Sequence, residues 1–535
     1  MLALLLGAAV LAGGTPARAA PEPGGAELAA YVRARAAAAN GAVDVAAKGY
    51  AAALAAVPGS EVVAVRAYRQ ALAAGDLALA GRAAEVLERS NVAPADAAVL
   101  GYATALERDD QPGADAALAT IGKGPLDFLA PVLAAWAAVE TGTGDPIALL
   151  DAAEGTALGR RYAGENRALM LIATGRDAEG VAALRALLGA DAGNLDLRRS
   201  AAELLMAAGR GDTARALLAG RDPVIRAIRT GLKEGAPGTV RWASARLFAR
   251  VAADLARDHL QPLQIALARA ALALDPTDGR AMLLLAEALG RDGATARALA
   301  TLDQAEALET YRPAVEGARV ALLAGAGEPL RALAAARTLA EAQGADADDW
   351  QRYGDLLLAA GRADEAADAY GSAIAQAGAA ARWTLFVQRG GALEQAGRWD
   401  EALPDLKRAV ALAPDEPHAL NALGYAQIER GEDVSAAQAL LERAAKLEPE
   451  SSAITDSLGW ALFRQGAADR ALPLLEKAAR SEPGDVTINE HLGDAYWRLG
   501  RRYEARYAWR AAAVHAEAVD AARLALKLTG STPEL

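Results

Sequence analysis

Small residues recur along this chain at a spacing of about 34, and this recurrence restricts the possible fold more than any other feature. Between the clearest units one spacing is longer by a single residue. A repeat of this length is typical of one pair of antiparallel helices per unit, stacked on its neighbours. The matching positions, unit by unit, are Gly390/Gly424/Gly459/Gly493, Gly397/Gly431/Gly466/Gly500, Ala402/Ala437/Ala471/Ala505 and Ala409/Ala444/Ala478/Ala512.

Each repeated position has a physical reason. The second glycine of a unit falls where a first helix of about 13 residues must end and reverse, and glycine adopts the left-handed conformation that ends helices. The first glycine lies inside that helix, where it costs about 1 kcal/mol relative to alanine. We therefore expect the second helix, with its repeated alanines, to pack directly on it. Pro414, Pro449 and Pro483 follow the second helix and cannot continue it.

The same spacing predicts further turns towards the N-terminus, at Gly41, Gly75, Asp109, Gly142, Gly175, Gly209, Gly293, Gly327 and Gly361. The register breaks after Gly209 and resumes if a turn near His259 is counted. The extra residues, around 231–240, indicate a loop insertion or a joint between two stacks. The expected organisation is a signal peptide at 1–19, N-terminal repeats at 20–230, an insertion or joint with an irregular pair at 231–278, C-terminal repeats at 279–516, and a capping helix with a tail at 517–535.

Composition favours an all-α stack of about 13 pairs. With 535 residues the chain is too long for one core. Hydrophobic residues make up 53%, mostly alanine and leucine, and aromatics only 4%, so strand-forming runs are missing. A net charge of −12 disfavours nucleic acid and anionic lipid as partners. With no cysteine, we expect no disulfide, no thiolate metal site and no lipid anchor through cysteine.

The first residues resemble a targeting segment. Leu2 to Leu11 is an apolar run too short to span a bilayer, and Ala17-Arg18-Ala19 matches a cleavage pattern that ends before Ala20. We expect a cleaved signal peptide and a periplasmic or secreted protein; the alternative is a buried first helix. No later segment has 18 uncharged apolar residues, so no transmembrane helix is expected.

At these glycine, alanine and proline positions the sequence resembles the tetratricopeptide repeat (TPR). The segments NALGYAQIERGED, ITDSLGWALFRQG and INEHLGDAYWRLGRRYEARYAWRAA are most similar to the ends of long proteobacterial envelope proteins with many such repeats. Related lipoproteins of that group are adaptors, which hold a C-terminal-processing protease and bring it cell-wall hydrolases. The resemblance thus implies a TPR solenoid that binds proteins. This chain departs from those lipoproteins in lacking a lipid-accepting cysteine.

In such a solenoid the first helices line a concave surface, to which positions 2, 5, 9, 12 and 13 of each unit contribute. Asn, Asp and Arg there can pair with a peptide backbone, and Trp or Tyr can anchor a partner. Alternatively, Trp460, Phe463 and Trp497 pack against the next first helix. The clamp that grips a terminal carboxylate needs lysine at position 5, so we expect none here. The candidate protein-binding residues are Asn421, Tyr425, Asp456, Trp460, Phe463, Arg464, Glu490, Asp494, Trp497 and Arg498.

No pattern indicates an enzyme, a cofactor or a metal site. The chain has four histidines, none spaced as a metal-binding pair, and we expect His418 and His491 at the surface. Asp346, Asp348 and Asp349 lack the glycine and glutamate of a calcium loop, so Asp346 is expected to cap a helix.

Two functions stay open. One is a periplasmic adaptor that recruits a protease or cell-wall hydrolase; the other is a structural component of an envelope assembly, such as a polysaccharide-export or secretion scaffold. The arginines Arg498, Arg501, Arg502, Arg506 and Arg510 indicate either a solvated helix face or a docking patch for an acidic partner.

Overall fold

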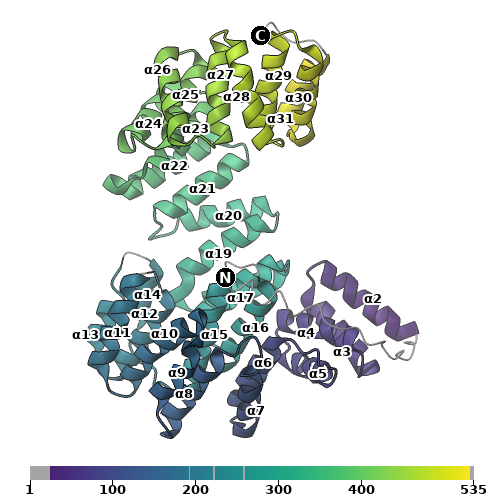
Figure 1. Cartoon of the computed structure of the whole chain (residues 1–535), viewed down its shortest axis with the longest axis vertical. Helices are drawn as coiled ribbons and strands as arrows, with labels where there is room; N and C mark the ends of the chain where they lie inside the picture. The colour runs from purple at the N-terminus through teal and green to yellow at the C-terminus, as the bar shows by residue number, and fades with distance from the viewer. Residues whose placement is uncertain (1–24, 192, 221–222, 257–259, 530–535) are drawn as a thin grey trace. The chain divides into compact units, whose positions relative to one another are not determined.

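The computed structural model describes residues 25–191, 193–220, 223–256 and 260–529 (Figure 1). All regular secondary structure in these residues is helical, as the sequence predicts. The chain divides into two compact units, residues 1–335 and 336–535. Consecutive helices form antiparallel pairs in both.

The first unit contains the following helices: α2 (Gly25–Ala39), α3 (Val43–Ala56), α4 (Glu61–Ala74), α5 (Leu77–Arg89), α6 (Ala95–Glu107), α7 (Gln111–Ile121), α8 (Leu129–Thr141), α9 (Pro146–Asp151), η1 (Ala152–Gly155), α10 (Ala157–Ala173), α11 (Asp177–Ala190), α12 (Leu195–Ala207), α13 (Gly211–Leu217), α14 (Pro223–Gly231), α15 (Val240–Leu255), α16 (Gln261–Leu274), α17 (Gly279–Arg291), α18 (Thr295–Glu306), η2 (Glu309–Tyr311), α19 (Arg312–Gly325) and α20 (Pro329–Ala340), within which the division falls.

The second unit contains α21 (Ala347–Ala359), α22 (Ala363–Ala377), η3 (Gly378–Ala380), α23 (Trp383–Gln395), α24 (Trp399–Leu412), α25 (Pro417–Arg430), α26 (Val434–Leu447), α27 (Ser452–Arg464), α28 (Ala468–Ser481), α29 (Val486–Arg498), α30 (Arg502–His515) and α31 (Ala518–Thr529). From α21 to α29, the odd-numbered helices are the first helices of their pairs and the even-numbered helices the second.

The turns lie where the spacing predicts them. Gly431 ends α25 with a φ of 68°, and Gly466 follows α27 with a φ of 82°, both in the left-handed region. The other expected turn glycines also have positive φ, and Asp109 adopts φ 55° without being glycine. The expected turn near His259 lies outside the described residues.

The glycines inside the first helices are packed as expected. A Cβ on Gly459 would lie 2.8 Å from Cδ2 of Leu475, and one on Gly424 would lie 2.9 Å from Cγ of Leu441. Each leucine comes from the second helix of the same pair, next to a fully buried alanine such as Ala471. The missing side chain thus lets the two helices approach closely.

The residues expected to form an insertion or joint pack inside the first unit. A Cβ on Gly235 would lie 2.0 Å from the backbone nitrogen of Ala207, and one on Gly238 would lie 3.1 Å from the Trp136 ring. The segment therefore runs directly over α12 and α8. The two compact units divide at Ala335, not within 231–278.

After this segment, α15 and α16 pack back onto the first helices of earlier pairs, contacting α4, α6, α8 and α12 (Figure 1). Tyr102 lies edge-on to Phe248 at 6.4 Å, and Trp136 lies edge-on to Trp242 at 5.8 Å. The guanidinium of Arg269 donates to the carbonyl oxygens of Leu72 and Ala73 at the end of α4, at 2.9 and 2.8 Å. The first helices α4, α6, α8 and α12 are thus covered by the chain itself.

The expected signal peptide at 1–19 lies outside the described residues. Among the helices that are described, none has the length and apolar character needed to cross a bilayer.

Candidate protein-binding site

The candidate residues are all on first helices of the second unit. Asn421 and Tyr425 are on α25, Asp456 to Arg464 are on α27, and Glu490 to Arg498 are on α29. Neighbouring first helices contact each other along the stack. The structure therefore brings these residues together on one face, and their role in binding stays a prediction.

Trp460 and Phe463 are packed inside the stack. The indole of Trp460 stacks on Phe463 at 4.9 Å and on the imidazole of His491 at 3.8 Å, and it is 7% exposed. Its Nε1 donates to the carboxylate of Glu429. These contacts match the alternative in which the aromatic residues pack against the next first helix, so a partner could reach Trp460 only by displacing its neighbours.

Trp497 is half-buried and lies against the second helix of its own repeat. Its ring is 5.2 Å from that of Trp509, and the guanidinium of Arg502 lies 3.6 Å from its centroid. Arg464 is exposed and pairs with Glu429 at 3.2 Å, and Arg498 is exposed at the end of α29.

The last positions of this face are covered by α31. Glu490 accepts hydrogen bonds from Arg523, and Asp494 accepts from Lys527 at 2.7 Å. Burial alone would raise the pKa of Glu490, but the bonds from Arg523 and Lys527 outweigh burial and lower the pKa. Burial raises the pKa of Asp494 despite its contact with Lys527. Helix α31 therefore covers and neutralises the acidic groups of α29.

The expectation that His491 lies at the surface is wrong. His491 is 6% exposed, and its Nδ1 is 2.8 Å from Oδ2 of Asp456. The sequence did not reveal this pair, because the two residues lie one repeat apart and meet only when the repeats stack. His418 is exposed, as expected.

Two acceptor oxygens on this face have no hydrogen-bond partner among the residues that the structure describes. They are Oδ1 of Asn421 and Oδ1 of Asp456, which occupy equivalent places in adjacent repeats. Tyr425 lies one turn after Asn421. Burial, followed by the charges of Glu429, Asp456 and Glu394, raises its pKa well above the usual range. The centre of the face is therefore rich in acceptors and in negative charge.

The first unit holds a buried ion-pair network among its helices. Asp278 is fully buried and accepts from Arg199 at 2.7 Å and from Arg246 at 2.6 Å. Burial alone would raise the pKa of Asp278, but the two guanidinium groups outweigh it and lower the pKa. The network joins α12, α15 and α17, and every charge in it has a partner within the chain.

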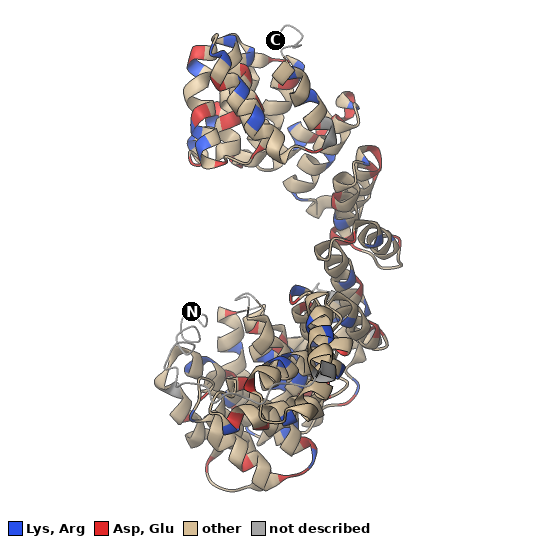
Figure 2. Ribbon diagram, turned by 90° about the vertical axis from the view of Figure 1, so that its right-hand side faces the viewer, with Lys and Arg blue, Asp and Glu red and all other residues tan. Residues whose placement is uncertain are grey.

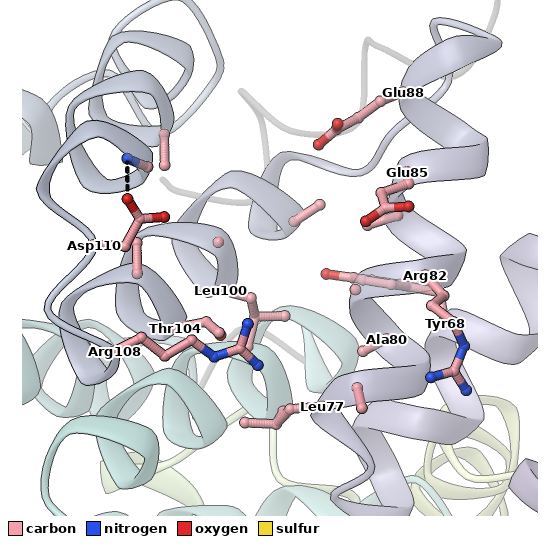
Figure 3. Close-up of a pocket in the computed structure, with 18 residues that line it drawn as sticks. Tyr68, Leu77, Ala80, Arg82, Glu85, Glu88, Leu100, Thr104, Arg108 and Asp110 are labelled. Atoms are coloured by element: carbon pink, nitrogen blue, oxygen red, sulfur yellow. Dashed lines mark hydrogen bonds between the residues drawn. The ribbon is translucent and has the colours of Figure 1, made fainter.

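A groove of about 420 Å³ opens on the first unit between α5 and α7, above α6 (Figure 3). Leu77 and Leu100 lie in it, and Glu85 and Glu88 on α5 face Arg108 and Asp110 across it. Its walls carry both signs of charge. Figure 2 shows the same mixture along the helices of each unit.

Asp346 caps α21 as expected. Its carboxylate accepts from the backbone N–H groups of Asp348 and Asp349, and the side chain of Asp349 accepts from the N–H of Asp346. Within the part of the chain that the structure describes, no group of three or more His, Asp or Glu side chains is placed to hold a metal ion.

Comparison with known families supports what the glycine and alanine positions indicate. The model of the family described as tetratricopeptide repeat matches residues 387–452 and 457–528. The chain contains tetratricopeptide repeats. The matched TPR segments include α25, α29 and all but residues 453–456 of α27, so among the candidate residues Asp456 alone falls between them. TPR proteins are scaffolds for interaction between proteins, and the repeat fold is typically not catalytic.

Two curated relatives match shorter stretches. A TPR repeat-containing protein of Pseudomonas aeruginosa, PA4667, is 45% identical over 62 residues, which are 12% of this chain and 10% of the relative. The Hsp70-Hsp90 organizing protein of Triticum aestivum is 33% identical over 127 residues, 24% of this chain and 21% of the relative. The chain thus spans about a tenth to a fifth of the length of these relatives.

Solved TPR structures are similar to parts of the chain. A TPR protein from Parabacteroides merdae is 13% identical and covers 46% of this chain and 97% of its own, with a TM-score of 0.41. YrrB, described as a TPR protein with an unusual peptide-binding site, is 21% identical and covers 35% of this chain and 95% of its own, with a TM-score of 0.29.

Proposed function

We propose that this protein is a non-catalytic scaffold of the cell envelope that binds a partner protein on the first helices α25, α27 and α29. The unpartnered oxygens of Asn421 and Asp456 carry this proposal. A buried acceptor without a donor destabilises a free chain. Both oxygens lie under other side chains, so a bound segment would gain hydrogen bonds here by displacing those side chains and supplying donors.

The contrast between the two units supports the same proposal. In the first unit, α15 and α16 cover α4, α6, α8 and α12, and Asp278 has its donors within the chain. Among the described helices of the second unit, only α31 covers a first helix in a comparable way, and it reaches α29 alone. We assign partner binding to the second unit for this reason.

We further propose that the protein is periplasmic or secreted and acts as an adaptor for a processing protease or a cell-wall hydrolase. This rests on the apolar run at Leu2–Leu11, on the Ala17-Arg18-Ala19 pattern, and on the resemblance of the last repeats to envelope adaptors. The second candidate, a structural component of an envelope assembly, rests on the same resemblance.

A pull-down of the tagged full chain from cell envelopes, followed by mass spectrometry, tests the function. An adaptor retains a soluble protease and small hydrolases, whereas an assembly component retains an outer-membrane channel. Retention of no envelope protein would contradict both.

Sequencing the N-terminus of the protein isolated from cells tests the location. We expect it to begin at or near Ala20. A mature chain that still carries Leu2–Leu11 and stays in the cytoplasm would contradict an envelope protein.

A further inference from the structure

Helix α30 carries an exposed stripe that differs from the outer faces of the other second helices. Tyr503, Tyr507 and Val514 are 84%, 72% and 75% exposed. Arg506 and Arg510 lie between them and are also exposed. At 100° per residue, all five side chains fall within about one third of the helix circumference. We call these five residues the α30 stripe.

The stripe lies on the outer side of the stack. The opposite face of α30 is formed by Ala505, Ala508, Trp509 and Ala512, which are buried and pack towards α29 and α31. In Figure 1, α30 is placed beside α29 and α31 at the end of the second unit. The α30 stripe therefore points away from the first-helix face of the proposed function.

The charge of the stripe is unusual for this protein. Its two arginines have no ion pair among the described residues, on a chain whose net charge is −12. The one acidic residue of α30, Glu504, lies off the stripe and pairs with Arg501 at 3.0 Å. By contrast, the exposed part of α28 carries acidic and basic side chains together, as with Asp469 and Arg470.

Tyrosine and arginine are the residues that most often carry binding energy at protein interfaces. Neither the tyrosines nor Val514 gain from full exposure to water. Their spacing along one helix face is the spacing at which a second amphipathic helix contacts its partner. The unpaired arginines require acidic side chains opposite them.

We infer that the α30 stripe is a second docking surface, which binds an acidic amphipathic helix of a partner protein. The inference rests on the proposed scaffold function and extends it. A scaffold with a first-helix face and a separate outer face can hold two different proteins at once, as an adaptor must.

Synthetic helical peptides test the inference on the full-length chain. Two 14-residue peptides share one leucine stripe, and their polar positions carry glutamate in one and lysine in the other. Fluorescence polarisation at low and at physiological salt measures their binding. We expect the glutamate peptide to bind, more weakly at high salt, and the lysine peptide not to bind.

Variants locate the binding surface. The double variant R506E with R510E should weaken the affinity for the glutamate peptide by about tenfold or more, and so should the separate double variant Y503S with Y507S. The matched control is R470E with R480E, which makes the same charge change on exposed positions of α28 and should leave the affinity unchanged. Because all these side chains are exposed, the melting temperatures should stay within a few degrees of the wild type.

The inference would be overturned if both peptides bound equally or if neither bound. It would also be overturned if the α28 control lost as much affinity for the glutamate peptide as the α30 variants. The pull-down from cell envelopes decides the proposed function separately. If the wild-type chain retains envelope proteins there while the peptide assay fails, the scaffold stands and only the α30 stripe is wrong.

Discussion

Asp278 and Asp456 are both buried aspartates, and their surroundings give them different roles. Asp278 accepts from two guanidinium groups and also from the backbone N–H groups that begin α17. The carboxylate of Asp456 contacts the imidazole of His491, and its Oδ1 has no donor within the described part of the chain. A buried charge with all its donors stabilises a core, whereas a buried oxygen that lacks a donor destabilises the free chain.

We predict that Asp278→Asn destabilises the first unit by about 3–5 kcal/mol at pH 7, because Arg199 and Arg246 lose their shared counter-charge. Since the folded pKa of Asp278 is lowered, its contribution is present above the pKa of the unfolded carboxyl. It is lost as the pH falls through the folded value. The difference in free energy of unfolding between variant and wild type should therefore shrink at acid pH, as measured by urea unfolding at a series of pH values.

The control for this prediction is Asp303→Asn. Asp303 pairs with Arg319 at 2.8 Å, but its side chain is 64% exposed. An exposed pair contributes about 0–1 kcal/mol. If Asp278→Asn and Asp303→Asn lowered the free energy of unfolding equally, the buried network would not be what holds α12, α15 and α17 together.

A second prediction concerns Asn421. Replacing it with leucine removes an unpartnered buried oxygen, so the free chain should keep or gain stability, by up to about 1 kcal/mol. The comparison variant is Asn489→Leu. Asn489 Nδ2 donates to the carbonyl oxygens of Pro483 and Asp485, so its loss should cost about 1–2 kcal/mol. Thermal unfolding measures both, and a large loss from Asn421→Leu would contradict our description of this face.

At the scale of the helix, the repeated glycines predicted the helix pairs and their turns correctly, because both depend on contacts within one repeat. Gly459 needs only the second helix of its own pair to explain it. The candidate site was predicted less well. The sequence placed Trp460 and Asp456 on the right helix but could not show that His491 of the next repeat covers both. A contact between neighbouring repeats depends on the rotation of each repeat relative to the one before it, and the spacing of the glycines does not encode this rotation.

Two adjacent glycines of α23 test the packing of helix pairs. A Cβ on Gly390 would lie 2.8 Å from Cδ2 of Leu406, whereas one on Gly391 would meet nothing within 4 Å. Gly390→Leu should overpack the contact between α23 and α24 and lower the free energy of unfolding by about 1–3 kcal/mol. Gly391→Leu should be neutral or stabilising, by up to about 1 kcal/mol, because leucine favours the helix. Unfolding monitored by circular dichroism distinguishes them, and similar effects at both positions would contradict the pairing contact.

At the scale of the whole molecule, the return of α15 and α16 onto α4, α6 and α8 was not predicted. Tyr68, Tyr102 and Trp136 recur 34 residues apart, and this regular placement of large aromatic residues was a signal that something bulky packs there. Trp242 and Phe248, which meet two of them, lie just after the segment that the sequence marked as an insertion. The sequence located the break in the repeats, but the direction in which the chain continues after it depends on long-range packing.

The two compact units predict that the full chain does not unfold in one step. Calorimetry should show at least two transitions. Asp278→Asn should lower only the midpoint temperature of the first unit's transition, and Gly390→Leu only that of the second unit's transition. A single transition that both variants shift equally would mean that the units unfold as one.

The covering of the first unit by α15 and α16 has an evolutionary consequence. Side chains that line the first helices there, such as Tyr102 and Trp136, are locked to residues far along the same polypeptide, so a change at one requires a matching change at the other. Asn421 is less constrained, because its Oδ1 is bound to no residue that the structure describes. We therefore expect relatives of this protein to vary more freely at Asn421 than at Tyr102 and Trp136.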